Sequence, residues 1–160
     1  MHIAILEAGR TNPKMPAEFH HYPDMFQTLF ADQPNCPDFQ FSIVPVIADV
    51  FPETVDDYDG YLITGSAYGV YDEVPFIPKL MEFIQDIFDT GKPLVGICFG
   101  HQILSKINGG KVKQSKHREF GLANIFKKKS SPLTKNFFKK KYTKVWMSHA
   151  DQVSKLPKNF

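Results

Sequence analysis

One segment constrains the fold of this chain more than any other: residues 93–104, Pro-Leu-Val-Gly-Ile-Cys-Phe-Gly-His-Gln-Ile-Leu. Its residues 94–98 form a continuous apolar run, which is typical of a strand buried on both faces of a parallel sheet. Residues 100–107 follow as an expected helix, which ends at Asn108 and the two glycines after it. A buried strand that passes directly into a helix indicates an α/β fold in which strands and helices alternate.

Comparable patterns occupy the rest of the first 110 residues. The strands expected from apolar runs span residues 2–7, 39–47 and 58–64, and the helices expected from helical spacing span residues 18–31 and 75–89. We expect the aromatic stripe of the first helix, which includes Tyr22, Phe26 and Phe30, to lie in the core. This alternation predicts a doubly wound sheet with helices on both faces.

The part of the chain after Gly110 differs in both pattern and charge. Three short strands joined by turns are expected, at residues 111–115, 121–126 and 144–148. Residues 1–110 hold 5 Lys/Arg and 15 Asp/Glu, whereas residues 111–144 hold 12 Lys/Arg and 1 acid, Glu119. Such a basic segment suits an anionic partner or simply a solvated surface. We favour the interpretation that the basic segment is a solvated surface, since its lysine clusters lack the interleaved aromatic and Arg residues that stack bases. Nucleic acid is therefore not an expected partner.

Length and composition place the chain among ordinary globular proteins. Its 160 residues and 18.3 kDa suit a single domain, residues 1–160, and 42% of the residues are hydrophobic. No apolar run approaches the roughly 18 residues of a membrane helix, and the first residues lack a secretory leader pattern, so we expect a cytoplasmic protein without membrane contact. The two cysteines, Cys36 and Cys98, lie in different settings and do not indicate a disulfide framework.

Cys98 stands at the expected junction of strand and helix. A sharp turn there brings neighbouring backbone close, and Gly96 and Gly100 supply the missing side chains that such a turn needs. A thiol at a helix N-terminus meets free N–H groups and the positive end of the helix dipole, which favour the thiolate, and the N–H of Phe99 is suited to hold an oxyanion. The alternative is a small buried hydrophobe, but a strained turn of this kind favours a nucleophile.

Four stretches of the chain resemble the class I glutamine amidotransferases, and most closely the glutaminase domain of GMP synthetases. Residues 96–102, Gly-Ile-Cys-Phe-Gly-His-Gln, resemble the nucleophile motif of this family. Residues 62–72, Leu-Ile-Thr-Gly-Ser-Ala-Tyr-Gly-Val-Tyr-Asp, are similar to its glycine loop. Residues 118–121, Arg-Glu-Phe-Gly, and 145–153, Val-Trp-Met-Ser-His-Ala-Asp-Gln-Val, are similar to the GMP synthetase subgroup. The resemblance covers the chain to about Val153.

The resemblance implies a flavodoxin-like doubly wound, mainly parallel sheet and a role for each matching residue. Cys98 would attack the side-chain amide of glutamine through a γ-glutamyl thioester and release ammonia, with Gly96, Gly100 and the supporting His101 forming the nucleophile elbow. The oxyanion hole would consist of the backbone N–H groups of Phe99 and of the glycine loop at Gly65 and Ser66. The residues implied to line the glutamine pocket are Gln102, Ser148, His149 and, more weakly, Asp151. The chain departs from the family at Ser66 and Ala67, where most members have a second glycine and a proline.

The catalytic base of the family is a further departure. That base, a His followed two residues later by a Glu, lies some tens of residues beyond the strand of His149, whereas Phe160 is the last residue here. We therefore expect a C-terminally shortened domain with impaired activity, whether shortened by cloning, proteolysis or a premature stop codon. Among the histidines present, His149 is the better substitute base and His101 the second.

We expect no cofactor and no metal, because the sequence holds neither zinc-ligand spacing nor a phosphate-binding glycine loop. The expected substrate is glutamine or another γ-glutamyl compound, and a separate synthetase is the expected partner if one exists. Two alternatives remain open. One is a γ-glutamyl peptidase-like hydrolase that uses the same thiol, and the other is a non-catalytic binding or regulatory module that retains the elbow.

Overall fold

The computed structural model describes residues 1–16, 19, 21–34, 37–129, 131, 134 and 141–158. The chain divides into two compact units, one formed by Met1–Val112 with Val153–Phe160 and the other by Lys113–Gln152. His20 and Cys36 lie outside the described residues, as does the last residue of the chain. In the part of the chain that is described, no helix is long and apolar enough to cross a membrane.

The first unit is built on a four-stranded parallel sheet with the order β2-β1-β3-β4. The strands are β1 (His2–Leu6), β2 (Gln40–Val44), β3 (Gly60–Ile63) and β4 (Leu94–Gly96). This is the flavodoxin-like strand order, in which the connections reverse between β1 and β3 and ligands bind beyond the carboxyl ends of the strands. The expected parallel, doubly wound α/β fold is confirmed.

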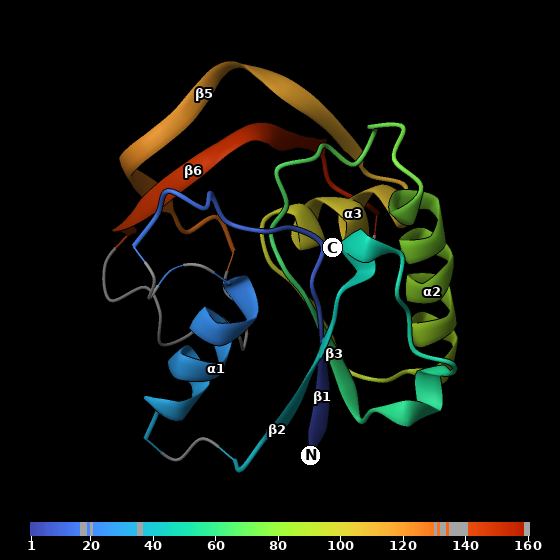
Figure 1. Cartoon of the computed structure of the whole chain (residues 1–160). Coiled ribbons are helices and arrows are strands. Elements are labelled where there is room, and N and C mark those ends of the chain that lie inside the picture. Colours follow the sequence, from blue (N-terminus) through green and yellow to red (C-terminus); the bar gives the residue numbers. More distant parts are fainter. Residues whose placement is uncertain are drawn as a thin grey trace. The chain divides into compact units, whose positions relative to one another are not determined.

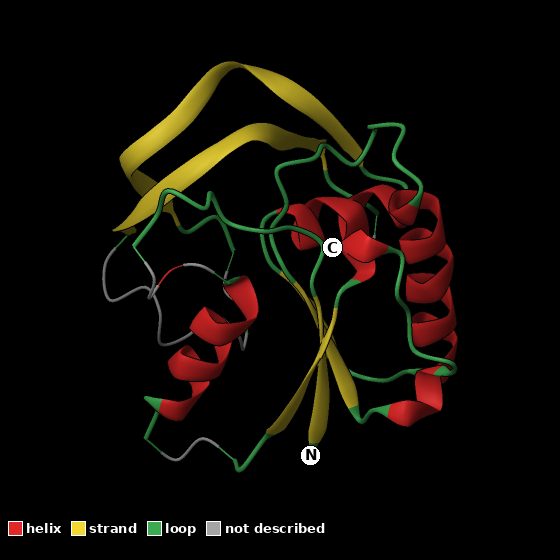
Figure 2. Cartoon of the chain, in the orientation of Figure 1, coloured by secondary structure: helices red, strands yellow, loops and turns green. Residues whose placement is uncertain are grey.

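Helices cover both faces of this sheet (Figure 1). The helices are α1 (Tyr22–Ala31), α2 (Phe76–Thr90) and α3 (Phe99–Ile107), with short 3-10 helices at Val46–Ala48 and Val55–Asp57. Helices α2 and α3 lie on one face and α1 on the other (Figure 2). The buried stripe of α2, which includes Leu80 and Ile84, packs in one core with Leu6, Ile63 and Phe99. Gly91 ends α2 in the left-handed conformation, with φ 70°.

Three expectations for this unit were wrong in detail. Strand β4 is an edge strand and is not buried on both faces, because Val95 is 52% exposed while α2 and α3 cover only the opposite face. Helix α1 begins at Tyr22, inside the expected range 18–31, since His21 is extended and Pro23 lacks the N–H that a position deeper in a helix would use. Residues 18 and 20 of that range lie outside the described residues. The chain after β2 turns into the 3-10 helix Val46–Ala48 and does not continue as a strand to residue 47.

The aromatic stripe of α1 is also less buried than expected. Within the helix only Pro23 is buried, and Leu29 is 54% exposed. Phe30 packs at the sheet edge against Phe39 and Phe41, with ring centroids 5.7 and 5.6 Å apart. The stripe therefore joins α1 to β2 at one end of the helix, while Tyr22 at the other end is only half-buried.

The second unit is a pair of long strands, β5 (Lys111–Phe126) and β6 (Tyr142–Lys155). The expectation of two separate strands at residues 111–115 and 121–126 was wrong, because both belong to β5. Gly121 adopts φ 119° inside this strand and does not turn the chain back. Phe120 and Trp146 stack edge to face on these strands at 5.6 Å and are both largely exposed.

Candidate active site

Cys98 occupies the apex of a strained turn between β4 and α3. Its backbone has φ 54° and ψ −105°, a region that non-glycine residues rarely adopt and that costs about 1–3 kcal/mol. The turn is closed by backbone hydrogen bonds, from Ile97 N to the carbonyl oxygen of Ile63 at 3.0 Å and from Gly100 N to that of Ile97 at 2.9 Å. The first bond ties the turn to the end of β3. The thiol-bearing residue is exposed.

The two flanking glycines are required by close backbone contacts. A Cβ added at Gly96 would lie 2.4 Å from the carbonyl carbon of Gly100, and one at Gly100 would lie 2.6 Å from the carbonyl oxygen of Ile63. Neither neighbour is the end of a flexible side chain, so neither could move aside. The Gly-x-Cys-x-Gly pattern therefore has the steric cause that the sequence suggested.

The glycine loop after β3 lies beside this turn. A Cβ at Gly65 would lie 3.6 Å from the Cβ of Cys98, so the loop backbone borders Cys98. The neighbouring loop at the end of β1 packs against it, because a Cβ at Gly9 would lie 2.5 Å from the Cα of Ser66. Sequence reasoning identified Gly65 and Ser66 but assigned no role to Gly9.

Thr64 holds the glycine loop in place, and sequence reasoning missed this residue. It is fully buried, and its hydroxyl accepts a hydrogen bond from Ala8 N and donates one to the carbonyl oxygen of Gly65, each 3.0 Å long. A peptide group is planar and trans, so fixing the Gly65 carbonyl also fixes the direction of the Ser66 N–H on the opposite side of that group. A buried Thr directly before the glycine loop was the signal that could have indicated this role.

Tyr22 is a further residue that sequence reasoning did not place in the site. A Cβ at Gly65 would lie 3.8 Å from its Cζ and 4.0 Å from its hydroxyl oxygen. Burial raises the pKa of Tyr22 above its ordinary value of 10.0, and the negative charge of Cys98 raises it further. The hydroxyl is therefore neutral at physiological pH and can donate a hydrogen bond.

The expected residues on α3 differ in accessibility. Phe99 is fully buried and packs against Phe76 with ring centroids 6.3 Å apart, so only its backbone can serve a ligand. Gln102 is only 7% exposed, and its N–H donates to the carbonyl oxygen of Cys98 at 3.0 Å. His101 is exposed, and partial desolvation lowers its pKa below the ordinary value of 6.5, so its imidazole is neutral at pH 7.

Ser148, His149 and Asp151 belong to β6 in the second unit. The structure brings His149 together with Glu119 of β5, with 3.1 Å between His149 Nε2 and a carboxylate oxygen of Glu119. Sequence reasoning quoted Glu119 only as part of a motif and gave it no partner. A carboxylate that holds one ring nitrogen orients the imidazole and sets its tautomer.

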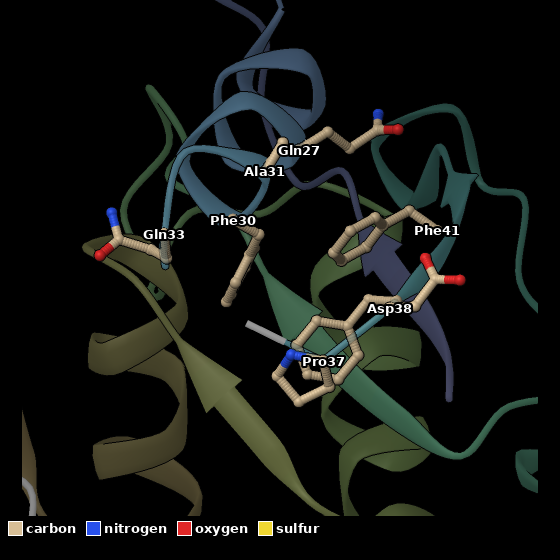
Figure 3. A pocket seen from close by; sticks show the side chains of 8 residues that line it. Gln27, Phe30, Ala31, Gln33, Pro37, Asp38 and Phe41 are labelled. Atoms are coloured by element: carbon tan, nitrogen blue, oxygen red, sulfur yellow. The ribbon is translucent and has the colours of Figure 1, made fainter. Parts of the chain in front are cut away.

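The described residues also include a hollow that Cys98 does not line. Among the described residues no group of three or more His, Cys, Asp or Glu could hold a metal ion. A hollow of about 450 Å³ lies at the far end of α1 from Tyr22, between that helix and β2 (Figure 3). Its lining includes Phe30, Phe39 and Phe41, the aromatic cluster that joins α1 to the sheet.

Comparison with known proteins identifies the family of the chain. The family described as glutamine amidotransferase class-I matches residues 25–160. The chain belongs to this family. Among the solved structures, this amidotransferase-family chain is similar to a glutamine amidotransferase from Thermotoga maritima, with a TM-score of 0.71 and 22% identity over 99% of this chain and 64% of that one. A glutamine amidotransferase from Methylobacillus flagellatus has a TM-score of 0.70 and 21% identity over 98% of this chain and 57% of that one. These likenesses show the fold.

Two kinds of curated relatives resemble the chain in sequence. Gamma-glutamyl peptidase 4 of Arabidopsis thaliana is 32% identical over 144 residues, which are 86% of this chain and 56% of that protein. The glutamine-hydrolyzing GMP synthase of Phocaeicola vulgatus is 38% identical over 112 residues, which are 69% of this chain and 20% of that protein. This amidotransferase-family chain therefore spans about half of the first relative and a fifth of the second.

Proposed function

We propose that this amidotransferase domain hydrolyses the side-chain amide of glutamine with Cys98 as nucleophile. The observation that carries the proposal is the approach of the glycine loop to the elbow, where the backbone at Gly65 borders Cys98. A nucleophile and oxyanion donors on opposite sides of one reacting carbon are what acyl transfer requires. The exposed thiol at the N-terminus of α3 is the only cysteine that the described residues contain.

The reaction would proceed in two balanced steps. The Cys98 thiolate adds to the amide carbon, the N–H groups of Phe99 and Ser66 hold the negative oxygen, and the nitrogen leaves as ammonia after it receives a proton. Water then adds to the γ-glutamyl thioester, glutamate leaves, and the thiolate is restored. The free N–H groups of α3 favour both anionic species.

His149 is our better candidate for proton transfer, and His101 is the second. The contact of His149 with Glu119 supports this choice, since a carboxylate partner orients the ring of a base. Gln102, Ser148 and Asp151 are proposed to line the glutamine pocket, although the burial of Gln102 leaves little of its side chain for a ligand. The proposed ammonia acceptor is a separate synthetase, and the resemblance to GMP synthase supports this partner.

A labelling experiment tests the nucleophile separately from turnover. The protein is incubated with a glutamine-like diazoketone, its intact mass is measured, and any adduct is mapped by peptide analysis. We expect one adduct, on Cys98, that excess glutamine prevents and that Cys98→Ser abolishes. Cys36→Ser is the matched control and should label like the unchanged protein. A folded protein without an adduct, or with one on Cys36, would contradict the proposal.

A γ-glutamyl peptidase is the second candidate function. The 32% identity to γ-glutamyl peptidase 4 over 86% of this chain favours it, and the chemistry at Cys98 would be the same. Release of glutamate from glutamine and from a γ-glutamyl dipeptide should be compared at equal concentrations. Faster release from glutamine supports the amidotransferase, whereas faster release from the dipeptide supports the peptidase.

A further inference from the structure

The space beside the nucleophile is bordered by a residue from a distant part of the sequence. Tyr22 is the first residue of α1, and the fully buried Pro23 fixes this end of the helix in the structure. The Cα of Gly65 carries no side chain, and its missing Cβ would lie 3.6 Å from the Cβ of Cys98 and 4.0 Å from the hydroxyl oxygen of Tyr22. The hydroxyl oxygen of Tyr22 and the Cβ that carries the Cys98 thiol therefore both lie within 4.0 Å of one point beside Gly65.

The charges in this space favour a particular hydrogen bond. The pKa of Tyr22 is raised first by burial and then by the charge of Cys98, so the phenol keeps its proton when the thiolate forms. The interaction is reciprocal, since a neutral O–H donor beside a thiolate stabilises the anion. Other titratable groups on the surrounding elements are His21 on α1, His101 on α3, and Glu7 and Arg10, which pair at the end of β1.

We propose that Tyr22 is a further functional residue of this site, whose hydroxyl donates a hydrogen bond to the thiolate of Cys98. The inference deepens the proposed function and rests on Cys98 being its nucleophile. No proton is transferred in this step: the hydroxyl keeps its hydrogen while Sγ is anionic. When Sγ bonds to the acyl carbon it loses its charge, and the hydroxyl is free to turn toward the negative oxygen. Gly65 is required in this arrangement because a side chain there would separate the phenol from the thiol.

The test measures how fast Cys98 is alkylated by iodoacetamide as a function of pH. A Cys36→Ser background leaves Cys98 as the only thiol, and Tyr22→Phe removes one oxygen atom from the ring. Compared with the Cys36→Ser background protein, the Tyr22→Phe variant should be alkylated about tenfold more slowly below the midpoint of the pH profile, and its midpoint should lie at higher pH. At high pH, where the thiol is fully ionised, the two proteins should react at equal rates. Tyr58→Phe is the matched control, since Tyr58 stacks on His2 near the start of β3, away from Cys98.

Each outcome decides the proposal. A Tyr22→Phe profile with an unchanged midpoint overturns it, and so does a rate lowered equally at every pH, which would mean altered access to the thiol. If Tyr22→Phe does not fold, as judged by thermal unfolding, Gly65→Ala replaces it, because its methyl group would meet the phenol of Tyr22 and the Cβ of Cys98 at ordinary contact distances. An unchanged midpoint in that variant also overturns the proposal. Iodoacetamide needs no glutamine pocket, so failure of diazoketone labelling would reject the proposed function while leaving the effect of Tyr22 measurable.

Discussion

Thr64 and Gly65 are joined by a 3.0 Å hydrogen bond from the side-chain hydroxyl of the first to the carbonyl oxygen of the second. The same hydroxyl accepts the N–H of Ala8, so one buried side chain connects the ends of β1 and β3 where the sheet reverses its connections. The glycine loop consequently has a defined orientation before any ligand binds. In the proposed reaction, donors oriented in advance would need no rearrangement when the oxyanion forms.

Thr64→Val should weaken both the fold and the chemistry. Valine has nearly the same shape but leaves the buried Ala8 N–H and Gly65 carbonyl without this partner, at a cost of about 1–3 kcal/mol in the free energy of unfolding. Diazoketone labelling of Cys98 should slow as well, because the Ser66 N–H loses its orientation. Urea unfolding and labelling rates check both effects. Thr64→Ser keeps the hydroxyl and is the control; equal behaviour of the two variants would contradict the role assigned to Thr64.

Gly96→Ala and Gly100→Ala should each destabilise the protein strongly. The added methyl groups would lie 2.4 and 2.6 Å from backbone atoms that cannot move aside, so we expect a loss of about 3 kcal/mol or more in unfolding free energy. Gly91→Ala is the matched comparison, since φ 70° strains alanine while no atom lies within 4 Å, and about 1–2 kcal/mol is expected there. Denaturant midpoints that placed Gly91→Ala as the most damaging of the three would refute the steric explanation.

His101 should make a small contribution to stability that depends on pH. Desolvation lowers the pKa of the folded-state imidazole below 6.5, so the unfolded chain binds the proton more readily. The contribution of His101 to stability is present above the pKa of the unfolded chain, about 6.5. It is lost as the pH falls through the lower pKa of the folded state. Urea unfolding at several pH values should therefore show a steeper loss of stability on acidification for the unchanged protein than for His101→Gln. Parallel curves would show that the ring is equally solvated in both states.

His149→Gln should reduce turnover far more than labelling. Removal of a general base lowers ammonia release by about 10²–10⁴-fold, whereas addition of the thiolate form of Cys98 to a diazoketone depends less on that base. Glu119→Gln should produce part of the same loss, and the double variant should be no worse than His149→Gln if the pair acts as a unit. His117→Gln is the control, because His117 is exposed on β5. Equal ammonia release by the His149 and His117 variants would exclude His149 as the base.

Local patterns in the sequence were sufficient for much of the fold. The helical spacing that predicted residues 75–89 matches α2 to within one residue at each end, because apolar spacing and the terminal Gly91 are local signals. The turn around Cys98 could also be predicted from the sequence, since a close contact between residues four apart requires the two glycines, Gly96 and Gly100. The errors came where burial depended on distant chain: Val95 looked like a core residue, yet β4 lies at the sheet edge.

The sequence by itself therefore determined the α/β class, the strand-to-helix turn at Cys98 and the family to which the chain belongs. Only the tertiary structure decided which distant residues meet: Thr64 with Ala8, Glu119 with His149, and Tyr22 beside Gly65 and Cys98. The physical reason is that backbone conformation is set by neighbouring residues, whereas side-chain encounters follow from strand order and packing. In the sequence, Tyr22 has the pattern of one more core aromatic in its helix, and only the parallel order of β1, β3 and β4 and the packing of α1 bring it near Cys98.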